Sequence, residues 1–353
     1  NYNCLLIKMF ILSLNTIISI CLLLVINFAL SKRKILIDKP DFAHHKFKHN
    51  DVIPLSGGIY FFLSLIYLSN FNNFEIKILI FLLPFLLIGL LADIRKEFPP
   101  KLRLIFQIFF FFIIVYFNEI KISSIDLVFF DKFLENKLFN FFFVIFCLVT
   151  ILNGHNFMDG LNGLVVGNFI LILLSIYYID LQLHEDLSQL TVILQNLIII
   201  SIVFFLFNIL GKCFLGDNGI YIFSIFISLV IILFIEKSQG LVSPLLAATF
   251  LWYAAFENLF SILRRIKKKK TVYAADKLHL HSLVINFLFL KFRKKFSFQK
   301  INTLSALLIN LCLLPNFILG ITWYNNSTKL AVLISVQILI YLFLYSKLSR
   351  LKN

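Results

Sequence analysis

Long apolar stretches alternate with short polar ones along almost the whole chain. Each apolar stretch is close to the length of about 20 residues that a helix needs to cross the hydrocarbon core of a bilayer. Four stretches are short, so the pattern predicts ten or eleven spanning helices. The predicted segments are 9–30, 54–70, 76–92, 104–118, 138–153, 163–180, 191–210, 220–235, 241–262, 301–323 and 329–346.

The composition agrees with this pattern. Of the 353 residues, 60% are hydrophobic and 14% are charged, whereas about 25% of residues are charged in a soluble domain. A soluble globular enzyme and a disordered chain are therefore excluded. The segments are evenly spaced and show no second domain. We predict one integral-membrane domain over residues 1–353, an all-α bundle of about eleven transmembrane helices.

Basic residues orient the bundle. The net charge is +15, and 26 of the 33 Lys and Arg residues lie in alternate loops or in the C-terminal tail. Cytoplasmic loops carry such an excess, so this side is predicted to be cytoplasmic, with the N-terminus outside and the C-terminus inside. The charge is explained without a nucleic-acid partner. The polar motifs lie on the same side, as expected for an enzyme with a soluble cytoplasmic substrate. These motifs lie in 31–58, 90–104, 153–164, 214–219 and 276–284.

Asp217 lies in the motif Gly-Asp-Asn-Gly, where a polar loop meets an apolar segment. Carboxylates at the edge of a membrane segment are costly and are usually functional. Mg²⁺ is commonly held by one or two carboxylates together with phosphate oxygens and water. The alternative is that Asp217 only caps the helix that follows.

A polar residue recurs at every third position in Asn153, Asn156, Asp159 and Asn162. Residues three apart are neighbours on a helix, so these four predict a polar stripe. Such a stripe could bind a nucleotide or a sugar, or it could form hydrogen bonds between helices.

Two further motifs carry charged or imidazole side chains that could bind a phosphate group. Asp93 precedes Arg95, Lys96, Lys101 and Arg103, which either bind a lipid phosphate or anchor helix ends. On a regular helix His279 and His281 would point about 200° apart, and they lack the spacing of a zinc pair. They suit a phosphate, while the neighbouring run Lys267–Lys270 could equally contact anionic lipids.

Together the five motifs resemble the polyprenyl-phosphate N-acetylhexosamine-1-phosphate transferases of glycosyltransferase family 4, from about Asp38 to about Leu283. Their order and their side of the membrane also match. The family includes the phospho-MurNAc-pentapeptide translocase and the undecaprenyl-phosphate GlcNAc-1-phosphate transferases. The resemblance implies transfer of HexNAc-1-phosphate from a UDP-sugar to a polyprenyl phosphate, with release of UMP and a need for Mg²⁺.

The resemblance also implies roles for individual residues. Asp217 matches the Mg²⁺ aspartate, Phe214 an aromatic that stacks on uracil, and Asp93 the second of an acidic pair that acts on the lipid phosphate. His279 and His281 match a motif that contacts the donor diphosphate.

The polar stripe matches the family's active-site cleft. Asn153, Asn156 and Asp159 correspond to its NxxNxxDG motif, and Asp159 is counted with Asp93 and Asp217 as catalytic. Asn162 replaces an aspartate that contacts uracil.

The sequence departs from the family pattern at two further positions, which marks a divergent branch. Ala92 stands where the family has the first acidic residue of the pair, and Ser282 stands where it usually has a third histidine. They leave open a catalytically degraded relative that only binds the lipid carrier or the nucleotide sugar. A transporter or flippase fits less well, because its polar residues should lie near mid-membrane.

The sequence thus predicts a multi-pass enzyme of a bacterial cytoplasmic (inner) membrane, with its active site facing the cytoplasm. Its expected partners are UDP-N-acetylhexosamine, undecaprenyl phosphate, Mg²⁺ and the lipid bilayer. The product would begin a surface glycan such as O-antigen or capsule, in lipopolysaccharide or cell-wall biosynthesis. A homodimer is left open.

Overall fold

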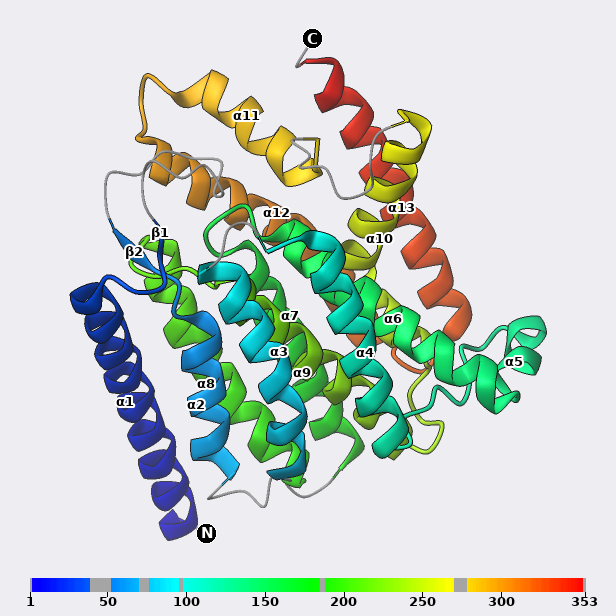
Figure 1. The fold of residues 1–353 in the computed structure, drawn as a ribbon. Coiled ribbons are helices and arrows are strands. Elements are labelled where there is room, and N and C mark those ends of the chain that lie inside the picture. The colour runs from blue at the N-terminus through cyan, green and yellow to red at the C-terminus, as the bar shows by residue number, and fades with distance from the viewer. Residues whose placement is uncertain are drawn as a thin grey trace. The chain divides into compact units, whose positions relative to one another are not determined.

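The structure is a computed structural model that describes residues 2–38, 52–69, 76–94, 98–184, 188–269 and 278–351 (Figure 1). The described residues form thirteen helices and a sheet of two short strands. Nine of these helices are long and apolar enough to cross a membrane. The prediction of an all-α multi-pass membrane protein is confirmed.

The first of two compact units comprises Asn1–Lys96 and Val166–Phe223. Within it, α1 packs against α2 and α8, and α2 packs against α3 (Figure 1). β1 pairs antiparallel with β2, with Ile37 opposite Pro54. The elements are α1 (Tyr2–Arg33), β1 (Ile37–Asp38), β2 (Ile53–Pro54), α2 (Gly57–Ser69), α3 (Ile76–Ile94), most of α7 (Leu164–Leu183), α8 (Gln189–Ile209) and the first turns of α9 (Gly216–Lys237).

The second unit comprises Glu97–Val165 and Ser224–Asn353. Here α10 packs against α6, α12 and α13, and α11 lies along α12 (Figure 1). The elements, besides the rest of α9, are α4 (Pro100–Phe117), α5 (Val128–Leu134), α6 (Lys137–Met158), α10 (Leu245–Lys267), α11 (Leu280–Phe292), α12 (Phe298–Thr322) and α13 (Ser327–Arg350).

Every predicted segment overlaps an observed helix. Nine segments correspond to the helices that are long and apolar enough to cross a membrane, and the other two to α2 and to α3, of which Ile78–Ile94 is the shorter apolar part. Two observed helices were not predicted. α5 has seven residues and α11 has thirteen, both too short to cross a bilayer as straight helices.

Local sequence signals explain where several helices begin. Pro100 stands at the start of α4, where its missing N–H is not needed. The side chains of Asn136, Ser188, Ser297 and Asn326 accept hydrogen bonds from the first amides of α6, α8, α12 and α13. Such caps satisfy backbone donors that have no partner inside the helix.

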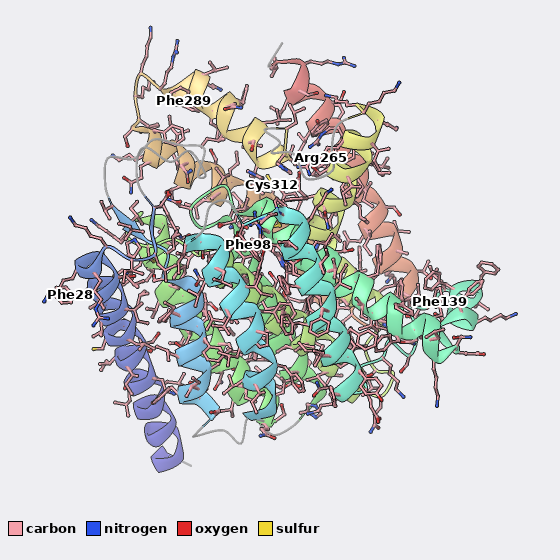
Figure 2. The ribbon with its side chains drawn as sticks, viewed as in Figure 1. Phe28, Phe98, Phe139, Arg265, Phe289 and Cys312 are labelled. Atoms are coloured by element: carbon pink, nitrogen blue, oxygen red, sulfur yellow. The ribbon has the colours of Figure 1, made fainter. Side chains whose placement is uncertain are left out.

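Apolar side chains remain uncovered on several long helices. Phe28 on α1 is 68% exposed and Phe343 on α13 is 67% exposed (Figure 2 labels Phe28). Because lipid rather than water surrounds a spanning helix, side chains of this kind suit a surface that faces acyl chains.

The predicted orientation can be tested by cysteine labelling in a background without the five native cysteines. We expect single cysteines at Lys212 and Lys268 to be shielded from a membrane-impermeant thiol reagent in intact cells, and to react after permeabilisation. Cysteines at Lys132 and Thr328 should react in intact cells, because the charge bias places them outside. Labelling of Lys268→Cys from outside would overturn this orientation.

Candidate active site

In the first unit the end of α3 meets the start of α9 through Asp93. Its Oδ1 accepts a hydrogen bond from the Asp217 amide at 2.9 Å, and its Oδ2 accepts one from the Asn218 amide at 3.0 Å. The side-chain amide of Asn218 also donates to Oδ2. Asp93 therefore caps α9 from a different helix and fixes the turn that carries Asp217.

The backbone around this cap is closely packed. Asn218 is fully buried, and its Oδ1 accepts a hydrogen bond from the Gly58 amide at 2.6 Å. Gly216 has a φ of +68°, and a Cβ there would lie 2.7 Å from Asp93 Oδ2. Glycine avoids both the strain of a positive φ and this close contact. Gly216, the first glycine of Gly-Asp-Asn-Gly, thus serves the cap.

Asp217 lies in the first turn of α9 and is half-buried. The structure assigns the cap of α9 to Asp93, where the alternative considered from sequence gave it to Asp217. A negative charge at this position also interacts favourably with the positive end of the helix dipole. The carboxylates of Asp93 and Asp217 are close enough to interact electrostatically.

This carboxylate pair fits a divalent cation in part. Among the described residues, no group of three His, Cys, Asp or Glu side chains could hold a metal ion. Mg²⁺ does not need such a cage, because one or two carboxylates suffice when substrate phosphates and water complete the shell. Both oxygens of Asp93 already accept amide hydrogen bonds, and the role of Asp217 as the Mg²⁺ ligand stays a prediction.

Phe214 lies just before α9 and is 8% exposed. Its backbone pairs with β2, since its amide donates to the Pro54 carbonyl at 2.9 Å. Its ring belongs to a cluster with Leu36, Ile53 and Leu55. Stacking on uracil therefore stays a prediction, and it would require one face of this covered ring to open.

In the second unit α6 ends at Met158, and Asp159 is its C-cap. Asn162 lies beyond the helix, and its backbone N–H donates a hydrogen bond to Asn302 Oδ1 on α12 at 2.7 Å. The prediction of a four-residue helical stripe was therefore wrong. At Asp159 the backbone has a φ of −73° and a ψ of 71°, which is not helical, so the helix ends before the stripe is complete.

One residue of the stripe that lies on α6, Asn153, forms a hydrogen bond to a neighbouring helix. Asn153 donates from Nδ2 to Gln107 Oε1 on α4 at 2.9 Å, as expected for a hydrogen bond between helices. Asn156 and Asp159 are partly exposed at the end of the helix. The substrate-binding roles of Asn153, Asn156 and Asn162 stay predictions.

His279 and His281 lie side by side next to the end of α6. Their rings are parallel, with centroids 5.5 Å apart and an interplanar angle of 9°. The prediction that they point about 200° apart was wrong, because His279 is the N-cap of α11 and lies outside the helix. A Cβ on Gly160 would lie 2.5 Å from His281 Nε2, so the loop after α6 abuts this imidazole.

Aromatic contacts join this pair to a buried arginine. The Phe157 ring lies 5.2 Å from that of His279, and the Arg265 guanidinium lies 5.2 Å from the Phe157 centroid. Arg265 is 5% exposed near the end of α10, where Figure 2 labels it. We call Phe157, Arg265, His279 and His281 the basic cluster. Its donors suit an anionic ligand.

Three residues of this region were missed from sequence: Arg265, Glu257 and Tyr341. Glu257 is fully buried and accepts hydrogen bonds from His279 and Tyr341. One signal could have found it, because Glu257 is the single acidic residue of the predicted segment 241–262.

The surrounding cations are only partly described. Lys267, Lys268 and Lys269 are exposed at the end of α10. The predicted contributions of Arg95, Lys96, Lys270 and Lys277 lie outside the described residues. Lys101 and Arg103 on α4 are described; their role toward a lipid phosphate stays a prediction.

The structure thus gathers the predicted residues in two groups. Asp93 and Asp217 meet in the first unit. The loop after α6, His279 and His281 meet in the second.

Residues 76–235 match the model of glycosyl transferase family 4. The chain is thus similar to this transferase family over residues 76–235, and its described residues include helices long and apolar enough to cross a membrane.

The chain is also similar, as a distant homologue, to undecaprenyl-phosphate GlcNAc-1-phosphate transferases. It is 26% identical over 307 residues to the undecaprenyl-phosphate alpha-N-acetylglucosaminyl 1-phosphate transferase of Escherichia coli K12, covering 81% of this chain and 78% of that protein. The Thermotoga maritima protein of the same name is 26% identical over 253 residues, covering 71% and 73%. A probable undecaprenyl-phosphate N-acetylglucosaminyl 1-phosphate transferase of Bacillus subtilis is 25% identical over 280 residues, covering 77% and 76%.

Proposed function

We propose that the chain transfers N-acetylhexosamine-1-phosphate from a UDP-sugar to undecaprenyl phosphate and releases UMP. A lipid-phosphate oxygen attacks the phosphorus that bears the sugar, the bond to the UMP phosphate breaks, and UMP leaves with that electron pair. The reaction would begin a surface glycan such as O-antigen or capsule, at the cytoplasmic face of a bacterial inner membrane. The observation that carries this proposal is the capping of α9 by Asp93, which holds Asp217 at the helix start.

Charge neutralisation is the main demand of this reaction. A nucleotide diphosphate and a lipid phosphate bring several negative charges together, and in phosphoryl transfer the protein mainly positions groups and stabilises charge. Asp217, with Asp93 behind it, would hold Mg²⁺, which when bound would neutralise phosphate oxygens. The basic cluster would donate hydrogen bonds to the donor diphosphate. Asp159 is the C-cap of α6, and the next residue, Gly160, lies against the imidazole of His281 on α11.

A dedicated base for the acceptor is not needed. The second pKa of a phosphate monoester is about 6, so the lipid phosphate is largely ionised near neutral pH. The hydrogen bonds of Asp93 instead support a positioning role toward Asp217. This is why one acid suffices where the family has a pair.

A long apolar cavity supports binding of a lipid acceptor. It has a volume of about 890 Å³ and lies in the second unit, between α6, α9, α10 and α13. Its lining is largely aliphatic and aromatic, and it extends from Thr150, one turn before Asn153 on α6, to the loops that carry Lys121 and Ser243, which the charge bias places outside. An isoprenoid chain would bury its surface there at the gain usual for apolar groups.

Ala92 stands where the family has the first acidic residue of its pair. Restoring an acid there tests whether the chain is an active transferase or a catalytically degraded relative. We expect Ala92→Asp to change turnover only modestly, because the added carboxylate is adjacent to Asp93 and diverges from it by about 100° on α3. Its added charge near an anionic substrate should at most weaken lipid affinity. A silent wild type that becomes active through Ala92→Asp would establish the degraded relative instead.

The proposal is tested in washed membranes supplied with undecaprenyl phosphate, Mg²⁺ and radiolabelled UDP-GlcNAc. We expect label to enter the lipid fraction together with an equal amount of UMP. Membranes with Glu135→Gln, an exposed carboxylate change beside α5, serve as the matched control and should behave as the wild type. Uptake of label into sealed vesicles without UMP would indicate transport and contradict the proposal.

A further inference from the structure

Glu257 is held between two side chains in the interior of the second unit. It lies on α10 and is fully buried. Its Oε1 lies 2.8 Å from His279 Nδ1, and its Oε2 accepts a hydrogen bond from the Tyr341 hydroxyl of α13 at 2.7 Å. Both carboxylate oxygens are thus occupied by named partners from two other elements. Burying a carboxylate is costly, and in a membrane segment it usually signals a function.

The pairing determines which nitrogen of His279 a ligand can meet. An ionised carboxylate only accepts hydrogen bonds, so Nδ1 of His279 must carry the proton that faces Glu257. Nε2 is then the ring nitrogen left for a ligand. The ring plane is fixed as well, since the rings of Phe157 and His281 lie 5.2 and 5.5 Å from that of His279.

We infer that Glu257, supported by Tyr341, is a positioning residue that accepts the Nδ1 proton of His279 and fixes the orientation of the ring, so that the protonated ring presents its Nε2–H as a hydrogen-bond donor to a phosphate oxygen of the nucleotide sugar. Carboxylates that orient a functional histidine through its second nitrogen act in this way. Glu257 acts through His279 and does not touch substrate itself. The substrate part of this inference rests on the proposed function; the part about the Nδ1 proton does not.

The first test measures the tautomer without any turnover. In detergent-solubilised protein with ¹⁵N-labelled histidine, the signals of His279 are assigned by their loss in His279→Gln. We expect Nδ1 of His279 to carry the proton in the wild type, and we expect Glu257→Leu, which removes the acceptor, to shift the proton to Nε2. A wild-type His279 with its single proton on Nε2 would overturn the inference, whether or not the protein proves to be a transferase.

The second test is a double-mutant cycle on the transfer reaction. We expect Glu257→Gln to lower kcat/KM for the UDP-sugar by about tenfold or more, the size usual for partners behind a ligand-binding histidine. In a His279→Ala background the same change should cost less than about twofold, because the histidine it positions is gone. If Glu257→Gln lowered kcat/KM by the same factor in the wild type and in His279→Ala, Glu257 would act independently of His279. That result would contradict the inference.

If Glu257→Gln does not insert in the membrane, Tyr341→Phe can replace it in the double-mutant cycle, because it disturbs the structure less. Tyr341→Phe removes one hydrogen bond to Glu257 and keeps the aromatic ring and the pair with His279. We expect it to reduce kcat/KM less than Glu257→Gln does, and again only when His279 is present. Glu135→Gln is the matched control and should leave kcat/KM unchanged. If the wild type transfers no sugar phosphate, the proposed function fails while the tautomer measurement still decides the role of Glu257.

Discussion

Asp217→Asn is expected to abolish nearly all turnover while the protein still inserts and folds normally. The change keeps the size of the side chain and removes the negative charge on which a divalent cation depends. It leaves the cap of α9 in place, because Asp93 accepts its hydrogen bond from the backbone amide of residue 217. We expect lipid-linked product to fall to background over a full Mg²⁺ titration, with an unchanged melting temperature in detergent.

The matched control for this variant is Glu135→Gln, which also converts an acid to its amide and should retain activity. Near-normal turnover of Asp217→Asn at saturating Mg²⁺ would remove Asp217 from the metal site. A lowered melting temperature would show that the side chain has a structural role that the backbone contacts do not account for.

Asp93→Asn is expected to lower turnover by at least about tenfold, or about 1.4 kcal/mol of transition-state stabilisation. An asparagine replaces one acceptor oxygen by an NH₂ group, which would face an amide that now donates to Asp93. Asp217 is then less firmly held. Unlike Asp217→Asn, this variant should also lose about 1 kcal/mol of stability, the usual value of a helix N-cap.

Kinetics and thermal unfolding of the same preparation together test this role of Asp93. Loss of activity with no loss of stability would indicate that Asp93 acts on substrate or metal directly. Unchanged activity with reduced stability would confine Asp93 to capping and remove it from the catalytic residues.

The helices were predictable because the signal is strong and local. Most spanning segments are long, mainly apolar stretches near the length of about 20 residues that the bilayer sets. α11 was missed because thirteen residues cannot cross a bilayer and because basic residues surround it in sequence. α5 was missed because it has only seven residues, two of them charged.

The chemistry of the site was partly predictable, and its geometry was not. Asp217, His279 and His281 stood out because polar groups next to apolar segments are unusual. Periodicity failed at Asn162 and at the two histidines, since a helix had to be assumed where a turn or a cap occurs. The capping of α9 by Asp93 and the contact of Glu257 with Tyr341 join positions 124 and 84 residues apart, which no local pattern encodes.

The mass of the lipid product tests sugar-phosphate transfer most directly. Purified protein is incubated with undecaprenyl phosphate, Mg²⁺ and a panel of UDP-N-acetylhexosamines, and the lipid fraction is analysed by mass spectrometry. We expect one donor to give N-acetylhexosamine joined to undecaprenol through a diphosphate, with UMP as the nucleotide released. A monophosphate-linked glycolipid with release of UDP, or no glycolipid from any donor, would contradict transfer of a sugar phosphate.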